Sequence, residues 1–485
     1  MSPASKAAGA IYPFSGSKNL PLNDSKPTAC LCLLKAKLLI QIREADVMAA
    51  DTNKELRNKM IYQVFVRNFS KQGTFAAVRE KLDDIRALGT DIIWFMPIHP
   101  IGKLKRKGNL GSPYAISDYR AVNPEFGTLE DFVSLVSAIH EKGMKCMIDV
   151  VYNHTSPDSL LSREHPEWFY HKPDGSFGNR VGDWSDIIDL DYSNKALWDY
   201  QIETLCYWAG YVDGFRCDVG PMIPIEFWEK ARKEVAKIRP DCIWLSESVE
   251  PEFIVYLRSQ GIIAHADCEM YRAFDICYDY DIYPDFKGIF NGSGSLEKYL
   301  CAVNRQEYIY PENYVKLNFL ENHDQTRAAF FIPDPRSLRS WTAFMFFRKG
   351  TALVYAGQEK GTAHLPDLFD KDTVCFDDKN GTDLTGLIAA LSGIKKDALF
   401  TDSVYSAKAA GDSFIVAVHK GKNEKAVGIF PVRGETASVP VGLEDGEYID
   451  RISGGKTEVL RGMTRCQGEP VILFSSDRQS AVKNA

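Results

Sequence analysis

The chain has 485 residues, of which 45% are hydrophobic and 25% charged, as is usual for a globular protein. Its net charge of −7 argues against nucleic acid as a partner, because phosphate binding needs a basic face. Since no run of about 18 apolar residues occurs, the sequence also predicts that no segment spans a membrane. The aromatic fraction of 12% fits either a large core or a sugar-binding cleft, and composition does not choose between them.

The first 47 residues differ from the rest, since they are rich in Ser, Pro, Lys and Ala and show no periodicity. We interpret residues 1–47 as a disordered tail or as an upstream extension from a misplaced start. Lys35 and Lys37 interrupt the apolar stretch 29–42, which argues against a signal peptide. The 11 cysteines form no CxxC pair, which favours buried, reduced thiols and a cytoplasmic location.

From residue 60 onward, predicted strands and helices alternate. Strands are predicted over 60–66, 91–96, 145–151, 212–217, 242–245, 262–266, 316–320 and 352–355, with helices over 75–88 and from Thr128 to Gly143. The strands are continuously apolar, which is typical of parallel strands covered on both faces. Eight such units predict an α/β fold, a (β/α)8 TIM barrel.

The order of these segments predicts three parts. The barrel takes residues 48–154 and 194–398, and a small insert after the third strand takes 155–193. Short β-type runs with Gly-rich turns follow, at 414–418, 425–430, 437–440 and 471–474. They predict a C-terminal all-β sandwich domain over 399–478.

Titratable residues follow four of the predicted strands, where a barrel gathers its active groups. His154 follows the third strand, Arg216 and Asp218 end the fourth, Glu247 ends the fifth, and His323 and Asp324 follow the seventh. Because alternate residues share one face of a strand, Arg216 and Asp218 are expected to point the same way. The carboxylates of Asp218, Glu247 and Asp324 are therefore predicted to meet over one barrel mouth.

In this order and spacing the motifs resemble those of the α-amylase family, glycoside hydrolase family 13. The matching stretches are 114–119, 149–154, 214–218, Glu247, 322–324 and 350–359. The resemblance implies a retaining enzyme that cleaves α-glucosidic bonds, above all α-1,4 bonds, in malto-oligosaccharides or α-glucans. It implies that Asp218 is the nucleophile, that Glu247 is the acid and then the base, and that Asp324 stabilises the distorted sugar.

The resemblance also implies four substrate-binding residues. Tyr114 would stack beneath the sugar, and His154 and His323 would donate hydrogen bonds to it. Arg216 is expected to lower the pKa of Asp218 and keep it ionised, while burial and neighbouring acids raise the pKa of Glu247. Asp149 is interpreted as a structural hydrogen-bonding residue rather than a catalyst.

Calcium is left open, and no organic cofactor is expected. Asn153 and Asp189 match positions at which some family members hold Ca²⁺, and their oxygens suit that ion. The chain departs from the family after the nucleophile, where Pro221 and Met222 replace the frequent Lys-His pair.

Several alternatives stay open. A glucanotransferase would use the same glycosyl-enzyme, and Val219 after the nucleophile resembles the α-1,6-acting oligoglucosidases. A remote alternative is a non-catalytic interaction protein of the same fold, which would need a membrane anchor and would lack the full acid set. No nucleic acid or membrane partner is expected, and the oligomeric state is open.

Two loop features are also open. The basic loop 103–107 is interpreted as solvated, with the alternative that it edges the cleft. Trp168 and Trp184 either pack the insert or serve as sugar platforms.

Overall fold

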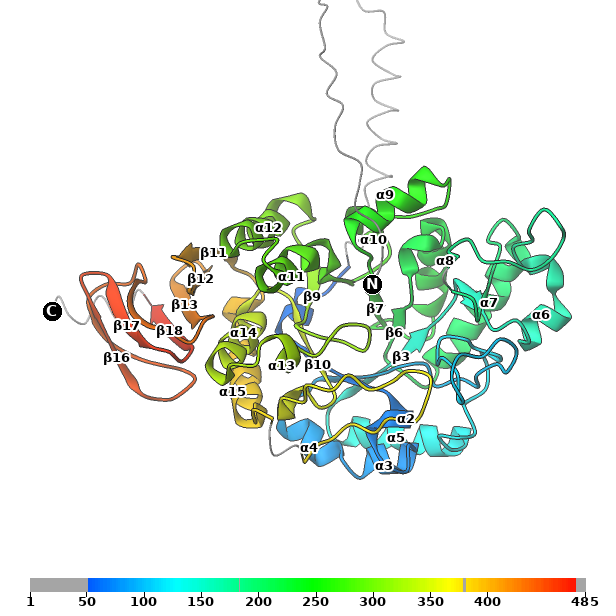
Figure 1. Cartoon of the computed structure of the whole chain (residues 1–485), viewed down its shortest axis with the longest axis horizontal. Helices are drawn as coiled ribbons and strands as arrows, with labels where there is room; N and C mark the ends of the chain where they lie inside the picture. The colour runs from blue at the N-terminus through cyan, green and yellow to red at the C-terminus, as the bar shows by residue number, and fades with distance from the viewer. Residues whose placement is uncertain (1–50, 183, 378–380, 477–485) are drawn as a thin grey trace, which may run out of the picture. The chain divides into compact units, whose positions relative to one another are not determined.

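The computed structural model describes residues 51–182, 184–377 and 381–476, and Figure 1 shows the barrel at its centre. Eight parallel strands close into a ring in chain order: β1 (Met60–Val64), β2 (Ile92–Phe95), β3 (Lys145–Val150), β6 (Gly214–Cys217), β7 (Ile243–Ser246), β8 (Ile276–Tyr278), β9 (Val315–Asn318) and β10 (Thr351–Tyr355). The ring closes where β10 pairs with β1, with Met60 opposite Ala352. The predicted TIM barrel is confirmed. The interpretation of residues 1–47 lies outside the described residues.

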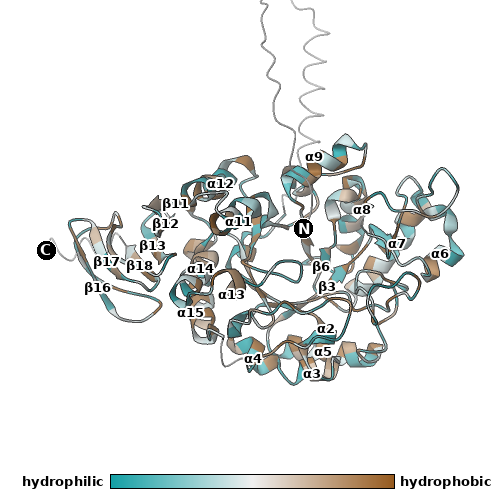
Figure 2. Cartoon of the chain, in the orientation of Figure 1, coloured by the Kyte–Doolittle hydropathy of each residue, from teal (hydrophilic) through white to brown (hydrophobic). Residues whose placement is uncertain are grey.

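Helices connect the barrel strands, and in Figure 2 many of them carry both brown and teal, as expected of helices with one buried face. They are α2 (Val66–Phe69), α3 (Phe75–Arg79), α4 (Leu82–Ala87), α5 (Leu129–Glu141), α7 (Lys195–Ala209), α8 (Ile225–Val235), α9 (Pro251–Ser259), α10 (Asp267–Met270), α11 (Tyr283–Asn291), α12 (Leu296–Ile309), α13 (Ala328–Phe331), α14 (Pro335–Phe347) and α15 (Thr385–Lys395). At the start of α5, Thr128 and Asp131 form the capping box that the sequence predicts.

Two predicted elements are wrong. The single helix expected over 75–88 is two short helices, α3 and α4, because Lys81 leaves helical geometry at φ −104° and ψ 5°. The strand expected over 262–266 is a loop, and the barrel strand is β8 instead. The apolar residues Ile262, Ala264 and Ala266 of that loop pack against a small cluster that contains Val219, which explains their pattern without a strand.

The segment after β3 is closed at its base by two short paired strands. Strand β4 (His154–Thr155) pairs antiparallel with β5 (Ile188–Asp189), so that His154 lies opposite Asp189. Between them lie α6 (Leu160–Glu164) and a 3₁₀ turn over Pro166–Trp168. This pairing brings the end of the predicted insert back to the strand end that carries His154.

Two antiparallel sheets follow the barrel and confirm the predicted all-β sandwich. One has the order β11 (Val404–Ala410), β12 (Phe414–Lys420), β13 (Glu424–Pro431) and β18 (Val471–Ser476), and the other β14 (Thr436–Pro440), β17 (Met463–Gln467), β16 (Lys456–Leu460) and β15 (Gly446–Ile449). Val427 and Leu473 of the first sheet share a core with Val459 and Cys466 of the second. The helix α14 contacts β13, where Phe347 packs on Phe430 at 5.5 Å.

No helix among the described residues has the length and apolarity that crossing a bilayer requires.

Candidate active site

A cavity of about 340 Å³ lies over the carboxyl ends of the barrel strands. Its lining brings together five of the residues that the sequence predicts, namely Tyr114, His154, Asp218, Glu247 and Asp324, with Lys107, Ser112, Trp184, Asp186, Ile187, Val219, Leu368 and Phe369. The two other predicted catalytic or substrate-binding residues, Arg216 and His323, contact these residues directly. The strand order explains the gathering, because parallel strands deliver their carboxyl ends to one side of a barrel.

Arg216 is the centre of the charge network. It is fully buried, and its Nη1 lies 2.7 Å from Asp218 Oδ1 and 2.8 Å from Asp149 Oδ1. Its Nη2 lies 2.8 Å from Glu247 Oε1. The register places Asp149 of β3 beside Arg216 of β6, and β7 delivers Glu247 next to them. One guanidinium therefore holds three carboxyl groups from three neighbouring strands.

The buried carboxyl groups resist ionisation. Burial raises the pKa of Glu247 to about 8, and Asp218 and Asp324 add to the rise while Arg216 opposes it. The expected raised pKa of Glu247 is confirmed. The expected lowering for Asp218 is wrong: burial raises its pKa to about 7, because it outweighs a guanidinium that Asp218 shares with Asp149 and Glu247.

The imidazoles of the site are neutral at pH 7, because burial lowers the pKa of both His154 and His323 to about 4. Gln63 contacts His323 Nδ1 at 2.7 Å, and Asp324 Oδ2 lies 3.1 Å from His323 Nε2. The ring of Tyr114 stacks on His323 at 5.3 Å. Partners on both ring nitrogens fix the orientation of His323 beside Asp324.

Asp149 has a supporting position. Its Oδ1 contacts Arg216, and its Oδ2 accepts a hydrogen bond from the hydroxyl of Tyr114 at 3.2 Å. It is completely buried and is not among the residues that line the cavity. These contacts agree with the structural role that we expect for it.

Val219, which follows Asp218, is a site residue whose backbone role the sequence does not reveal. It adopts the left-handed region at φ 37° and ψ 41°, which is rare for a β-branched residue. In this conformation its amide donates a hydrogen bond to Glu247 Oε2 at 2.8 Å. The two oxygens of Glu247 are thus held from two sides, by Val219 and by Arg216.

One wall of the cavity joins three loops that sequence reasoning did not connect. Lys107 forms a 2.8 Å ion pair with Asp186 of the insert, and its Nζ lies 5.8 Å from the ring centre of Phe369. The side chain of Asp186 is only 6% exposed. For Lys107, the alternative that the basic loop edges the cleft is therefore correct. The adjacency of Lys107 to Phe369 depends on long-range contacts such as that of Asn109 N with Asp370 Oδ1.

The two tryptophans of the insert have different positions. Trp184 lines the cavity and contacts His154 at 5.7 Å between ring centres. Trp168 is buried and stacks on His165 at 3.8 Å, and it is absent from the cavity lining. Of the two candidate sugar platforms, only Trp184 lines the cavity.

The residues considered for calcium do not form a fitting site. Asp189 Oδ1 is buried without a hydrogen-bond partner, but Oδ2 accepts from Arg180 N at 2.7 Å and lies 3.5 Å from its guanidinium. The side-chain nitrogen of Asn153 faces His154. Calcium takes six to eight oxygens, and the positive charge of the Arg180 guanidinium beside Asp189 opposes a second cation there. The charge beside Asp189 is Arg180.

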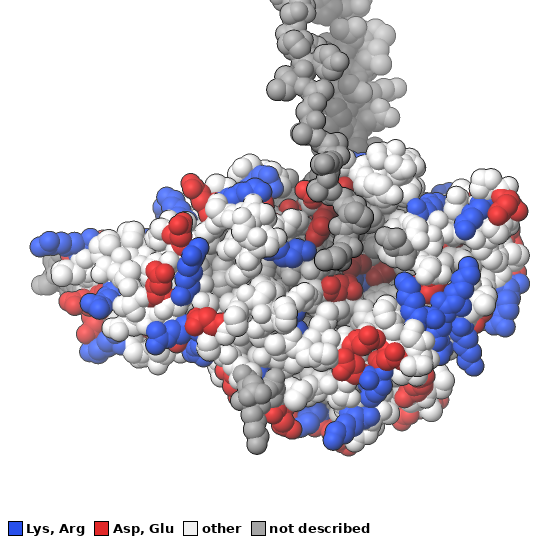
Figure 3. All heavy atoms as spheres, viewed as in Figure 1, with Lys and Arg blue, Asp and Glu red and all other residues white. Residues whose placement is uncertain are grey.

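Charge on the surface is mixed. On the face drawn in Figure 3, Lys and Arg are interspersed with Asp and Glu, and no continuous basic face is seen there.

Family models match almost the whole described chain. Residues 50–411 match the α-amylase catalytic domain, and residues 406–473 match the bacterial α-amylase C-terminal domain. An acid-lined cavity at the mouth of a (β/α)8 barrel, followed by this β-domain, is the architecture of a glycoside hydrolase of the amylase type. The chain belongs to the α-amylase family.

Two solved structures resemble it over most of its length. An α-amylase from Lactobacillus plantarum is 46% identical, with a TM-score of 0.85, and the match covers 87% of this chain and all of the other. The maltogenic α-amylase AmyB from Thermotoga neapolitana is 32% identical, with a TM-score of 0.77, and 87% and 99% of the two chains are covered.

Curated relatives match over shorter parts. An α-1,4-glucan:maltose-1-phosphate maltosyltransferase from Rhodospirillum rubrum is 38% identical over 36% of this chain and 28% of its own. The α-amylase MalA from Haloarcula japonica is 25% identical over 83% of this chain and 60% of its own. The chain thus spans less than two thirds of the length of either relative.

Proposed function

We propose that this chain is a retaining glycoside hydrolase that cleaves α-1,4 bonds in malto-oligosaccharides or α-glucans. The observation that supports it best is the contact of Asp218 and Glu247 with the two terminal nitrogens of Arg216, which keeps the carboxyls adjacent. Retaining enzymes use two carboxyls roughly 5 Å apart, one ionised and one protonated. Burial raises the pKa of both carboxyls while Arg216 opposes the rise. In this proposal Asp218 is the ionised carboxyl and Glu247 the protonated one.

The reaction has two steps. In the first, Glu247 gives its proton to the glycosidic oxygen while that oxygen leaves the anomeric carbon, and a carboxylate oxygen of Asp218 bonds to the carbon. In the second, Glu247 takes a proton from water, the water oxygen bonds to the same carbon, and Asp218 is released. The amide of Val219 and the guanidinium of Arg216 hold Glu247 in place for both steps.

Four further residues bind or orient the sugar in this proposal. Asp324 is 40% exposed at its side chain, so its carboxylate can accept hydrogen bonds from sugar hydroxyls. His323, neutral and held by Gln63 at Nδ1, lies 3.1 Å from Asp324 Oδ2 and orients that carboxylate. Tyr114 and His154 line the same cavity and bound the sugar from other sides.

The charge of the cavity favours a neutral donor. Four carboxyls line it, those of Asp186, Asp218, Glu247 and Asp324, and the one lysine of the lining, Lys107, is paired with Asp186. A phosphate dianion would find no unpaired cation among these lining residues. We therefore favour a glucan over maltose 1-phosphate as donor, although a maltosyltransferase is among the relatives. Glucanotransfer between neutral chains is the second candidate, because it uses the same glycosyl-enzyme.

The test is product analysis over time with maltoheptaose, panose, pullulan and maltose 1-phosphate. We expect shorter malto-oligosaccharides from maltoheptaose and no release of phosphate. Products longer than the input would favour transfer, and cleavage of the α-1,6 bond of panose would favour the oligoglucosidase alternative. No turnover of any of these compounds would overturn the proposal and favour a non-catalytic protein.

Variants assign the roles. Asp218→Asn and Glu247→Gln should each lower kcat roughly 10³-fold or more while the circular dichroism spectrum stays the same. Asp83→Asn, at an exposed ion pair on α4, is the matched control and should keep full activity. Near-normal turnover by either active-site variant would refute the assignment.

For the location we propose the cytoplasm. The buried thiols of Cys146, Cys217 and Cys277 support a reducing compartment, because free cysteines persist there.

A further inference from the structure

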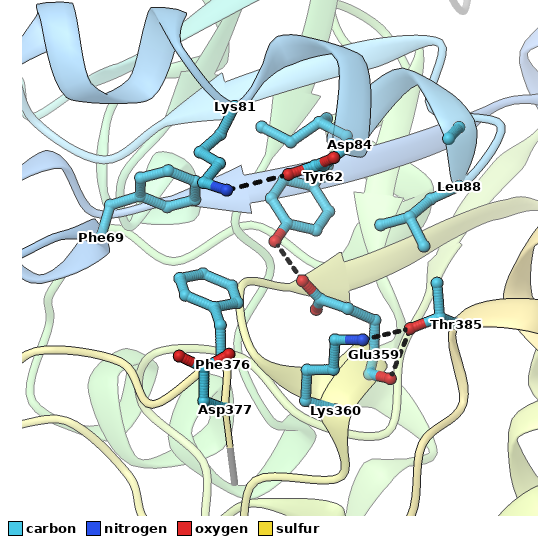
Figure 4. Close-up of a pocket in the computed structure, with 12 residues that line it drawn as sticks. Tyr62, Phe69, Lys81, Asp84, Leu88, Glu359, Lys360, Phe376, Asp377 and Thr385 are labelled. Carbon is cyan, nitrogen blue, oxygen red and sulfur yellow. Dashed lines mark hydrogen bonds and ion pairs between the residues drawn. The ribbon is translucent and has the colours of Figure 1, made fainter.

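A second cavity, of about 370 Å³, lies at the side of the barrel (Figure 4). It is formed between the region of α4 and the segment 359–385 that follows β10. It is lined by Tyr62, Phe69, Lys81, Asp84, Ile85, Ala87, Leu88, Glu359, Lys360, Phe376, Asp377 and Thr385. None of these residues lines the catalytic cavity. A pocket of this size accommodates a small ligand.

The floor of this cavity is polar and rigid. The hydroxyl of Tyr62 donates a hydrogen bond to Glu359 Oε1 at 2.7 Å, and Gly357 N donates to Oε2 at 2.9 Å. Both side chains are buried, and Figure 4 shows the Tyr62 hydroxyl turned toward the Glu359 carboxyl between the two walls. A phenol oxygen and a carboxyl with remaining lone pairs can both accept hydrogen bonds from ligand hydroxyls.

The walls are apolar. Phe69 and Phe376 meet edge to face at 5.3 Å on one side, and Figure 4 shows Leu88, which follows α4, on the other. Ile85 of α4 also lines the cavity. Phe376 is only partly buried, so its ring is accessible from the cavity. Flat rings above a polar floor suit a ligand with an apolar face and hydroxyl edges.

The charges at the rim are balanced. Lys81 pairs with Asp84 at 3.1 Å, and Lys360 lies 3.4 Å from Asp383 and 3.0 Å from the hydroxyl of Thr385. Asp377 adds another carboxylate. Because these carboxylates offset both lysines, the cavity has no surplus positive charge for an anion. A neutral ligand is favoured over a phosphate or a carboxylate.

The chain that forms this cavity also forms the catalytic one. It runs from Glu359 in this cavity to Leu368 and Phe369 in the catalytic cavity, then back to Phe376. Hydrogen bonds fasten it to the first barrel loop, from Asn68 Nδ2 to Asp367 O at 2.7 Å and from Val374 N to Asn68 O at 2.8 Å. The two cavities are separate but share one ordered segment.

We propose that the second cavity is a carbohydrate site that binds one or two glucose units of an α-glucan without cleaving them. The choice of ligand rests on the proposed function, while the cavity stands on its own geometry. Such a site would hold a long glucan chain on the protein while another part of it reaches the catalytic acids.

The experiment titrates maltotriose into the full chain carrying Asp218→Asn, with isothermal calorimetry and protein-observed NMR as readouts. We expect two binding sites. The added change Phe376→Ala should weaken one site on the order of tenfold or more and leave the other unchanged. Ala87→Trp, which fills the cavity from the exposed side of α4, should do the same if Phe376→Ala fails to fold. Phe330→Ala, at a ring that is 67% exposed on α13, is the control.

A single maltotriose site would overturn this inference, as would two sites that neither cavity variant affects. Stronger binding of glucose 1-phosphate than of maltose at the second site would overturn it as well. Cleavage of maltoheptaose by the unmodified chain is measured separately. If the chain that carries only Asp218→Asn has no second site while the unmodified chain cleaves maltoheptaose, this inference alone is refuted. Absent cleavage with two binding sites refutes the proposed function alone.

Discussion

The backbone amide of Val219 donates a hydrogen bond to Glu247 Oε2 at 2.8 Å, and Val219 makes this contact from a left-handed conformation at φ 37°. A β-branched residue in this region is strained by roughly 1–3 kcal/mol. Packing compensates, because the Val219 side chain lies in a cluster with Met222 and Leu257. The strain thus turns an amide toward the proposed acid.

Replacing Val219 by glycine and by alanine should reveal this strain. Both changes remove the packed side chain, but only glycine enters the left-handed region without cost. We expect Val219→Gly to be more stable than Val219→Ala by about 1 kcal/mol, measured by urea unfolding. In the interior of helices and strands the alanine variant is instead the more stable one. If the alanine variant is the more stable one, the left-handed conformation is refuted.

The pH profile follows from the raised pKa values. Asp218 must be ionised to attack, so kcat/KM should rise through about pH 7, and Glu247 must be protonated to donate, so it should fall through about pH 8. The two groups share Arg216, so the two limbs belong to the cluster as a whole. A profile that is flat from pH 5 to 9 would contradict this geometry.

The free energy of unfolding should also depend on pH through the raised pKa of Glu247. The folded chain holds the Glu247 proton up to about pH 8, whereas the unfolded chain loses it near 4.5. This contribution is therefore complete below pH 4.5 and is lost as the pH rises to 8. Since glutamine does not titrate, the Tm of Glu247→Gln relative to the unmodified chain should increase from pH 5 to pH 9. Glu444→Gln, at an exposed position, should show no such trend.

The wall residue Lys107 should affect substrate binding more than chemistry. Lys107→Met leaves Asp186 buried without its cation, next to the cavity. Lys107 is 35% exposed, so solvent screens its ion pair, and we expect its loss to cost about 1 kcal/mol of substrate-binding free energy. This corresponds to roughly a fivefold rise in KM with little change in kcat. The double variant Lys107→Met/Asp186→Asn should restore most of the loss. Lys103→Ala, at an exposed position in the same loop, is the control.

An equal fall in kcat for Lys107→Met and Lys103→Ala would show that the loop acts by general electrostatics. Failure of the double variant to recover would show that the ion pair itself does not shape the wall.

Most barrel strands were predictable, because parallel strands covered on both faces are continuously apolar, as in Ile92–Phe95. Strand β8 was not. It is three residues long and is flanked by Asp275 and Asp279, whose carboxyls pair with Arg232 and Arg348. Its charged flanks have partners that are distant in the sequence, and no local pattern contains that information.

The candidate site also has a part that the sequence predicts and a part that it does not. Strand ends placed Asp218, Glu247 and Asp324 together, since the fold alone gathers them. The cavity wall of Lys107, Asp186 and Phe369 comes from three loops whose meeting depends on contacts between distant segments. The direction of the Asp218 pKa shift depends on burial and on three acids sharing one guanidinium, neither of which a motif records.

The insert should be stabilised by Arg180 rather than by calcium. The Arg180 guanidinium lies 3.5 Å from Asp189 and 4.4 Å from the ring centre of Tyr170. Arg180→Ala should lower the Tm by a few degrees at pH 7, since it leaves a buried carboxylate unpaired. At pH 4 the loss should be smaller, because burial raises the pKa of Asp189 and a protonated Asp189 needs no cation. Lys172→Ala, exposed in the same segment, is the control. EDTA should leave the Tm of the unmodified chain unchanged, whereas a fall in Tm with EDTA that calcium reverses would assign the stabilising charge to the metal.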